Sequence, residues 1–382
     1  MNPTPILPPA MLGILGGGQL GRMFAIAAKT MGYGVTVLDP DPNAPAARFA
    51  DCHLCAPFDD AEALKTLAQC AAVTTEFENV HAQSMRDLAQ HTRVSPSGDC
   101  VAIAQNRIAE KAWIRKAGLP TAPYQTVEHS GDIDEGTAQY LPGILKTATL
   151  GYDGKGQIRV HTVAEVQAAF EQHGGVACVL EKMVDLRAEI SVIVCRLDSR
   201  HTATYDPAEN RHDNGILSYS TVPARLPEAV QQQARQMAVR LADALDYVGV
   251  LAVEMFVVGD AQDLVVNEIA PRPHNSGHHT IDACAASQFQ QQVRLMCGLP
   301  PADTRLLSPC TMANILGDLW GGNGGEPHWE AVQQNPSAHL HLYGKTAARN
   351  GRKMGHFTVL ADTADQAYAA AQQLHAQLDN TE

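Results

Sequence analysis

Positive charge is scarce in this sequence: 28 lysines and arginines stand against 41 aspartates and glutamates, a net charge of −13 over 382 residues. This balance argues against non-specific binding to nucleic acid, which needs a basic surface. The sequence also lacks internal repeats and low-complexity tracts. No cationic segment precedes the apolar run Met11–Leu15, which ends at glycines after five residues. We therefore expect neither a signal peptide nor a membrane span.

The cysteines follow no paired pattern. Nine of them, an odd number, are scattered between Cys52 and Cys310. Dispersed cysteines without an export signal are typical of reduced thiols, so we expect a cytoplasmic protein. Cys52 and Cys55 have CxxC spacing, but a redox or zinc role needs a helix N-terminus or a second ligand pair. Neither is evident, so we interpret this spacing as incidental.

The order of the predicted elements indicates several domains. A strand at Met11–Leu15, a helix at Gln19–Thr30 and strands at 35–38 and 71–75 predict a βαβ start and a parallel sheet. A small α+β unit follows, and a third unit contains a long helix at 228–245. A chain of 382 residues, 45% of them hydrophobic, has enough material for more than one core.

A glycine-rich loop joins the first strand to the first helix. Residues 16–21 fit GxGxxG, and Asp39 ends the next strand about 20 residues further on, as in dinucleotide-binding folds. The glycines allow the backbone to approach an anion at the helix N-terminus. Three interpretations remain open at this point: a nicotinamide or flavin cofactor, another phosphate ligand, or a tight turn.

Two glutamates are predicted to face each other across a β-hairpin. Strands at 250–258 and 264–269 flank a turn centred on Ala261, which sets Glu254 directly opposite Glu268. Side chains at such positions share one face, with Cβ atoms about 4.5–5.5 Å apart.

Like charges at this separation destabilise a sheet unless something neutralises them. Carboxylate oxygens suit Mg2+, so we expect Glu254 and Glu268 to hold that ion, with an oxygen of Asn267 nearby. Strand alternation predicts that Glu268 shares its face with Val266 and Leu264. The alternative is a different register that leaves both carboxylates in solvent.

A second glycine-rich segment, 151–157, lies between two predicted strands. It is therefore not a Walker A loop, which connects a strand to a helix. Three glycines and Lys155 at a hairpin tip can still fold their amides over a triphosphate, and Lys146 on the preceding strand points to the same space. A flexible turn is the alternative. Residues 181–184 end an apolar strand that we expect at a sheet edge, where backbone groups can meet a purine ring.

The segment 272–279, RPHNSGHH, is dense in side-chain donors. His274 and His278 have the i,i+4 spacing that suggests zinc on a helix. Pro273 and Gly277 argue against a helix, so we favour a polar substrate loop with its arginine as an anion clamp.

As a set, these motifs resemble the ATP-grasp superfamily. Within it, they resemble the enzymes that form 5-(carboxyamino)imidazole ribonucleotide, the ATPase subunit of phosphoribosylaminoimidazole carboxylase. The matching segments occur in order over nearly the whole chain: GILGGGQLGRM, VTVLDPDPNAPA, TTEFENV, LKTATLGYDGKGQ, VLEKMV, NEIAPRPHNSGH and YGKTAARNGRKMGH. GGGQLGRM, EFENV and APRPHNSGH are specific to these enzymes, whereas the second glycine loop and the glutamate pair are shared across the superfamily. Lys155 stands where arginine is also common.

The resemblance implies an α/β and α+β ATP-grasp fold in four segments. These are a pre-ATP-grasp parallel α/β domain at 1–105, a mobile lid at 106–185, a metal- and nucleotide-binding grasp domain at 186–308 and a small C-terminal extension at 309–382. We expect a homodimer in the cytoplasm that binds small-molecule substrates, with neither nucleic acid nor membrane as a partner.

The resemblance also implies the ligand sites. ATP would lie between the lid and the grasp domain, in contact with Arg107, Lys146, Gly151, Tyr152, Asp153, Gly154, Lys155, Gly156, Gln157, Glu181, Lys182, Met183, Val184, Glu189, His212, Asn267 and Glu268. Mg2+ would be held by Glu254 and Glu268. The first glycine loop would face a ribonucleotide rather than a dinucleotide, and the substrate-site candidates are Gln19, Leu20, Glu76, Asn79, Arg272, Lys345 and Arg352. We expect the last three to converge on the phosphate.

The implied reaction begins when bicarbonate attacks the γ-phosphate of ATP and forms carboxyphosphate. Carboxyphosphate releases CO2 beside the amine of aminoimidazole ribonucleotide, which becomes a carbamate. Asp153 and Lys353 are the candidates for handling bicarbonate. Two alternatives stay open: another ATP-grasp carboxylate ligase, such as a formate-using transformylase or a biotin carboxylase, and an NAD-binding oxidoreductase built on the first glycine loop.

Overall fold

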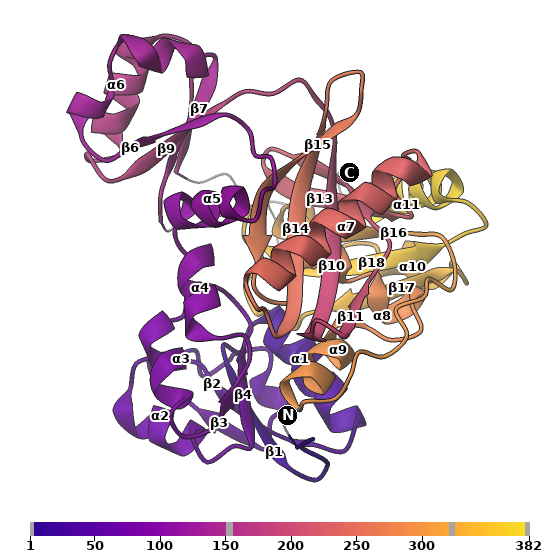
Figure 1. The fold of residues 1–382 in the computed structure, drawn as a ribbon. Helices are drawn as coiled ribbons and strands as arrows, with labels where there is room; N and C mark the ends of the chain where they lie inside the picture. Colours follow the sequence, from indigo (N-terminus) through magenta and orange to yellow (C-terminus); the bar gives the residue numbers. More distant parts are fainter. Residues whose placement is uncertain (1–3, 150–155, 321–324, 379–382) are drawn as a thin grey trace.

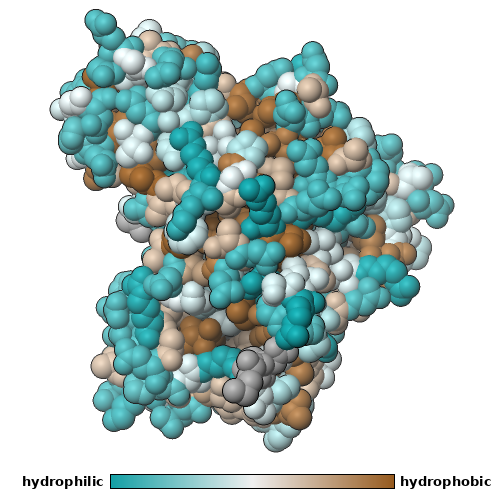
Figure 2. Space-filling model, in the orientation of Figure 1, coloured by the Kyte–Doolittle hydropathy of each residue, from teal (hydrophilic) through white to brown (hydrophobic). Residues whose placement is uncertain are grey.

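The computed structural model describes residues 4–149, 156–320 and 325–378. Figure 1 shows an N-terminal unit at the bottom, a small lobe at the upper left and a larger body on the right. Hydrophilic side chains cover most of the small lobe and much of the body's outer surface (Figure 2). No helix in the described ranges is both long and apolar enough to cross a membrane.

The N-terminal unit is a five-stranded parallel sheet in the order β3-β2-β1-β4-β5. Its strands are β1 (Met11–Leu15), β2 (Gly34–Leu38), β3 (Cys52–Leu54), β4 (Ala72–Thr75) and β5 (Arg93–Val94). Its helices are α1 (Gln19–Thr30), α2 (Ala61–Leu67), α3 (Ala82–Leu88) and α4 (Gly98–Ala104), with the 3-10 turn η1 (Ala47–Phe49). The predicted βαβ start is confirmed. Its central strands are short apolar runs because helices cover both faces of the sheet.

All nine cysteines lie in the described ranges and are free. Cys52 opens strand β3 and Cys55 follows it, so the CxxC segment is not at a helix N-terminus.

The small lobe, called the lid below, is a four-stranded antiparallel sheet in the order β6-β9-β7-β8. Its elements are β6 (Tyr124–Val127), η2 (Ser130–Asp132), η3 (Glu135–Tyr140), β7 (Gly143–Thr147), β8 (Gln157–Val160), α6 (Val163–Gln172) and β9 (Cys178–Lys182). The prediction that β9 is an edge strand is wrong, because β6 pairs with its free side. β6 is only partly buried and has no clear apolar alternation, so the sequence did not indicate it.

Helix α5 (Arg107–Lys116) connects the N-terminal unit to the lid, and the side chain of Asn106 caps its first turn. The body is one nine-stranded sheet with the order β15-β14-β10-β12-β13-β16-β18-β17, and β11 pairs with β10. The strands are β10 (Leu186–Asp198), β11 (His201–Thr204), β12 (Ala208–Asp213), β13 (Ile216–Val222), β14 (Gly249–Val258), β15 (Asp263–Ala270), β16 (Cys310–Leu316), β17 (Ala338–Leu342) and β18 (Lys353–Leu360). The remaining elements are α7 (Glu228–Ala244), η4 (Asn275–Gly277), α8 (Thr280–Ala283), α9 (Gln288–Met296), η5 (Gly317–Trp320), α10 (Trp329–Gln333) and α11 (Ala364–Leu378).

Two junctions fix the units relative to one another. Strand β16 pairs with β13, so the C-terminal segment extends the sheet of the body. Helix α9 packs on α1 of the N-terminal unit (Figure 1), and Phe24, Phe289 and Val293 belong to one buried cluster. The N-terminal unit and the body therefore share a buried core.

Candidate active site

One cleft gathers residues from the N-terminal unit, the lid and the body. Its cavity volume is about 1190 Å³, more than the roughly 300–1,000 Å³ of a pocket for one small ligand, so two substrates can lie side by side. The sequence-predicted site residues that line it are Gln19, Leu20, Glu76, Asn79, Arg107, Lys146, Gln157, Glu181, Lys182, Met183, Val184, Glu189, His212, Glu254, Asn267, Glu268, Arg272, Lys345, Arg352 and Lys353. Gly156 is described but does not line the cleft. Gly151, Tyr152, Asp153, Gly154 and Lys155 lie outside the described residues.

The hairpin of β14 and β15 brings two carboxylates to the cleft. Glu254 lies directly opposite Glu268, as predicted from the turn position. The register shifts at the next pair, where Met255 lies opposite Val266 and leaves Asn267 as an extra residue on β15.

This bulge corrects the prediction that Glu268 shares its face with Val266 and Leu264. Those two side chains are buried in the core, whereas Asn267 and Glu268 both line the cleft. One extra residue reverses the alternation of a strand, which re-aims the side chain that follows it.

The two carboxylates have different electrostatic surroundings. Burial, and then the charge of Glu268, raise the pKa of Glu254 to about 8. Burial also acts to raise the pKa of Glu268, but Arg107 outweighs it and holds that pKa below its usual value, with Nη1 2.8 Å from Oε2. Glu268 is therefore stabilised in its charged form by Arg107, whereas the neighbouring cations do not offset the effect of burial on Glu254.

Glu110 on α5 is a buried neighbour of this pair that the sequence did not reveal. Its carboxylate accepts a hydrogen bond from the backbone amide of Ile269 at 2.6 Å, and burial followed by the charge of Glu268 raises its pKa to about 8. In the sequence nothing distinguishes Glu110 from other glutamates in predicted helices. The one available signal is its position one helical turn after Arg107, which was itself predicted to contact the nucleotide.

The donor atoms at the carboxylate pair suit a hard cation. Glu254 and Glu268 supply carboxylate oxygens, and the buried Oδ1 of Asn267 has no hydrogen-bond partner among the described residues. An unsatisfied buried oxygen is costly unless it finds a donor or a cation. Three oxygen-bearing side chains without sulfur or nitrogen ligands fit Mg2+.

A buried ion triad lies on the lid side of the cleft. Glu181 of β9 lies 3.1 Å from Lys146 of β7 and 3.1 Å from Lys111 of α5, and all three side chains are at most 7% exposed. Lys146 and Glu181 line the cleft. The triad therefore ties the lid sheet to α5 and fixes the position of the Lys146 ammonium group.

Replacing Glu181 with alanine leaves two buried ammonium groups without their shared carboxylate. We expect a loss of about 3–5 kcal/mol in the free energy of unfolding, the usual cost of removing one partner of a buried pair. Chemical denaturation followed by circular dichroism measures this. Glu171→Ala on the exposed face of α6 is the matched control and stays near wild-type stability. Equal stability of both variants would show that the triad is not needed.

The first glycine loop is occupied by a carboxylate of the protein. The backbone amides of Gly18 and Gly21 each donate to Glu76 at 2.6 Å, and the amide of Gly17 donates to Asp39 at 2.7 Å. These amides at the start of α1 are where a dinucleotide fold holds the pyrophosphate. Glu76 takes that position, so the geometry does not fit the dinucleotide interpretation.

The three predicted phosphate ligands have different partners. Lys345 donates to the side chain of Gln19 at the start of α1 and to the backbone carbonyl of Lys353 at 2.6 Å. Arg352 donates to the carbonyl of Ala347 at 2.8 Å within its own loop.

Arg272 is paired elsewhere, with Glu78, and this pairing outweighs burial and lowers the pKa of Glu78 to about 2. Glu78 was missed from the sequence, although it lies in the EFENV motif. Lys345 therefore lies at the α1 end of the cleft. Arg272 lies two residues before His274, which contacts Glu254, and its own partner is Glu78.

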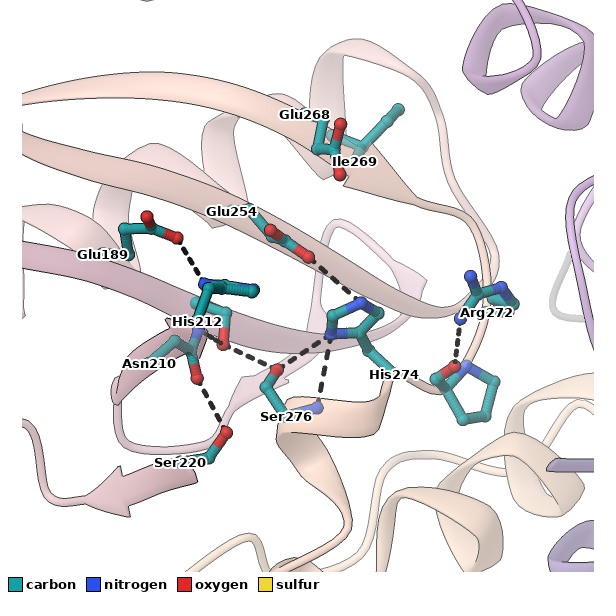
Figure 3. Close-up of polar contacts among 12 residues, drawn as sticks. Glu189, Asn210, His212, Ser220, Glu254, Glu268, Ile269, Arg272, His274 and Ser276 are labelled. Atoms are coloured by element: carbon teal, nitrogen blue, oxygen red, sulfur yellow. Dashed lines mark hydrogen bonds and ion pairs between the residues drawn. The ribbon is translucent and has the colours of Figure 1, made fainter. Parts of the chain in front are cut away.

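The histidine-rich segment does not form one site. His274 lies with Nε2 3.0 Å from Oε1 of Glu254, and its Nδ1 contacts Ser276 (Figure 3). His278 is fully buried and lies against Gln288 instead. The two histidines contact different partners because residues 275–277 form the turn η4 rather than an α-helix.

Glu189 and His212 form another pair that faces the cleft (Figure 3). Nδ1 of His212 lies 2.6 Å from Oε2 of Glu189. Burial lowers the pKa of His212, but Glu189 outweighs it, so the net direction is upward.

Three family models match the chain in order along its length. A ribonucleotide synthetase preATP-grasp domain matches residues 10–105, an ATP-grasp domain matches residues 112–289, and a phosphoribosylaminoimidazole carboxylase C-terminal domain matches residues 310–370. The N5-carboxyaminoimidazole ribonucleotide synthase of Bacillus subtilis (strain 168) is 42% identical over 374 residues, which cover 96% of this chain and 95% of that protein.

Solved structures of similar proteins share the whole fold. The Staphylococcus aureus N5-carboxyaminoimidazole synthetase complexed with ADP has a TM-score of 0.90 at 35% identity, covering 99% of each chain. The Aspergillus clavatus N5-carboxyaminoimidazole synthase in complex with ADP and 5-aminoimidazole ribonucleotide has a TM-score of 0.88 at 32% identity, covering 97% of this chain and 98% of that one. From the ordered motifs, the fold and these relatives, the chain belongs to the N5-carboxyaminoimidazole ribonucleotide synthase family of ATP-grasp ligases.

Proposed function

We propose that this chain uses ATP and bicarbonate to carboxylate the amine of 5-aminoimidazole ribonucleotide, in purine biosynthesis. The observation that supports this most directly is the single cleft, with the facing carboxylates of Glu254 and Glu268 at one end and the paired Gln19 and Lys345 at the other. The A. clavatus relative, which was solved with both ADP and the aminoimidazole ribonucleotide, supports the assignment of two ligands to one cleft.

On the nucleotide side, we assign ATP to the space between the lid and the carboxylate pair. Lys146 is held in place by Glu181, and residues 182–184, at the end of β9 and just after it, line the cleft. Glu189 and His212, which contact each other, face the same space from the body. Lys146 and Arg107 are suited to offset negative charge on the phosphates.

Mg2+ belongs to this proposal through its fit to Glu254, Asn267 and Glu268. When bound, it would supply positive charge that offsets the charge of the transferring phosphoryl group. The chain itself binds and orients the reactants, and closure of the lid would exclude water from short-lived carboxyphosphate.

On the ribonucleotide side, we assign the phosphate to Lys345 and Arg352, with Gln19 beside them. Leu20, Glu76 and Asn79 would contact the remainder of this substrate from the N-terminal unit. Arg272, which is paired with Glu78 and lies two residues before His274, is suited to an anion, either the same phosphate or bicarbonate.

Three further assignments complete the proposal. Lys353 opens β18 and lines the cleft, which supports a role in handling bicarbonate, and Asp153 remains its proposed counterpart. Nine free thiols support a cytoplasmic location. The last assignment is a homodimer, and light scattering coupled to size-exclusion chromatography measures the mass of the particle in solution.

A coupled assay of ADP release tests the function. We expect ADP release that depends on aminoimidazole ribonucleotide together with bicarbonate, because the cleft must hold both before the carbamate forms. Formate in place of bicarbonate is the control that separates this activity from a transformylase. ADP release that responded to formate and not to bicarbonate would refute the proposed substrate.

The oxidoreductase alternative predicts binding of a reduced nicotinamide. We expect no binding, because the carboxylate of Glu76 already occupies the amides of Gly18 and Gly21. Titration with NADH, followed by the fluorescence of its reduced nicotinamide, measures this. A saturable NADH signal in the micromolar range would restore the alternative.

A further inference from the structure

A line of buried polar side chains crosses the sheet beside His274 (Figure 3). Ser220 of β13 donates to Oδ1 of Asn210 at 2.8 Å, Nδ2 of Asn210 on β12 donates to Ser191 at 2.9 Å, and Ser191 of β10 donates to Ser276 at 2.7 Å. We call these four residues the polar relay. None of them is more than 8% exposed.

Strand register explains why these distant residues meet. Asn210 lies opposite Ser220 on β13 and opposite Glu189 on β10. Ser191, two positions after Glu189, lies directly opposite Glu254 on β14. Residues two apart on a strand share a face, so the relay and the catalytic-cleft carboxylates are on the same side of the sheet.

The relay has one direction of hydrogen-bond donation. The amide nitrogen of Asn210 can only donate, so Ser191 accepts there and its single hydroxyl proton goes to Ser276. Ser276 thus accepts from Ser191, and its own proton is left for Nδ1 of His274, 2.9 Å away. A buried chain of this kind is costly to reverse, because every member would have to find a new partner.

A second contact fixes the same nitrogen independently. The backbone N–H of Ser276 points to Nδ1 of His274 at 3.4 Å. A backbone N–H cannot accept, so Nδ1 receives hydrogen bonds from two sides and carries no proton. The proton of the neutral imidazole is therefore on Nε2, which lies 3.0 Å from Oε1 of Glu254.

We infer that the polar relay fixes the Nε2-protonated form of His274, whose Nε2 lies 3.0 Å from Glu254, and thereby orients this carboxylate. Ser191, Asn210, Ser220 and Ser276 are positioning residues that act through His274. His274 is then not available to accept a proton from a substrate through Nε2, so the proton lost by the amine goes to another group. What the oriented carboxylate binds rests on the proposed function, whereas the state of the imidazole does not.

Nuclear magnetic resonance of the resting enzyme tests the state of the imidazole directly. The two ring nitrogens of neutral histidine differ in 15N chemical shift and in two-bond couplings, so 15N-histidine labelling reports which one is protonated. A His274→Gln variant assigns the signals. We expect Nδ1 to be unprotonated and Nε2 to be protonated. A proton on Nδ1 would overturn the inference, whether or not the enzyme turns over.

Two relay variants test the consequence for catalysis. Asn210→Asp is nearly isosteric, but its carboxylate can only accept, so Ser191 must turn away from Ser276. Ser191→Ala removes the central link. We expect kcat to fall about 10-fold in each variant, the lower end of the loss found when a residue that holds a metal ligand in place is replaced. We also expect a mixture of the two imidazole tautomers. The KM for ATP should stay within about twofold of the wild-type value.

Thr311→Val is the matched control, because it breaks a buried hydroxyl contact with Thr221 on the same sheet, 3.0 Å long, outside the relay. It should keep the wild-type kcat and tautomer. If Ser191→Ala kept both the wild-type kcat and the Nε2-protonated form, the relay would not position His274. Wild-type enzyme without ribonucleotide-dependent ADP release, but with the expected tautomer, would contradict the proposed function alone.

Discussion

Glutamine at position 254 or 268 lowers ribonucleotide-dependent ADP release by about 10²–10³-fold, the loss expected when one preorganised electrostatic group is removed from a water-poor site. The substitution keeps the shape of the side chain and removes its charge. Glu254 and Glu268 lie directly opposite each other, so either variant leaves one carboxylate to bind a divalent cation. Raising Mg2+ restores part of the activity, because a weakened site fills at higher concentration but keeps fewer anionic ligands.

The same hairpin provides the control. Asp260 lies in its turn, where it is 95% exposed and forms a surface ion pair with Arg187. Asp260→Asn removes the same unit of charge from the same hairpin and should leave turnover unchanged. Normal ATP turnover in both Glu254→Gln and Glu268→Gln would show that the facing carboxylates do not hold the metal.

The position of the carboxylate pair was predictable because a short hairpin links register to turn position. Seven residues on either side of Ala261 put Glu254 opposite Glu268, and the structure has that pair. The faces of the neighbouring residues were not predictable, because the bulge at Asn267 changes the count by one. A bulge depends on how the side chains of the strand pack in the core, and a polar residue such as Asn267 does not by itself indicate one.

Contacts between segments that are distant in the sequence could not be predicted from sequence patterns. The glycine loop was recognised, but its occupant, Glu76, is 58 residues from Gly18 in the chain. Ser191 and Ser276 are 85 residues apart and look like ordinary polar positions in a strand and a loop. Local periodicity reports which face of an element is buried, whereas such contacts depend on how elements pack together.

The prediction that β9 is an edge strand is wrong for a related reason. Its apolar residues and polar end were read correctly, but β6 carries the sequence YQTV and only one fully buried side chain. A strand that is partly exposed on both faces has no alternation to recognise. Residues 182–184, at the end of β9 and just after it, still line the cleft, so the proposed contact with the nucleotide does not depend on an edge strand.

Alanine at position 352 is expected to raise the KM for the ribonucleotide by about 10- to 100-fold, because a charge-assisted hydrogen bond contributes roughly 1.5–3 kcal/mol and 1.4 kcal/mol is tenfold. Arg352 lies immediately before Lys353 and β18, and its side chain is held by the carbonyl of Ala347. Lys345 of the same segment reaches Gln19 at the start of α1, which places this segment at the ribonucleotide end of the cleft.

The KM for ATP should hardly change, because the proposed ATP site is next to Lys146 and Glu181 of the lid rather than next to Arg352. Initial rates at varied concentrations of each substrate separate the two effects. Arg305→Ala is the control cation: its side chain is 71% exposed and pairs with Asp303 on the surface, so both KM values should stay at the wild-type level. A variant Arg352→Ala with normal ribonucleotide KM and weakened ATP binding would move this arginine to the other ligand, and Lys345 would then remain as the cation that holds the phosphate.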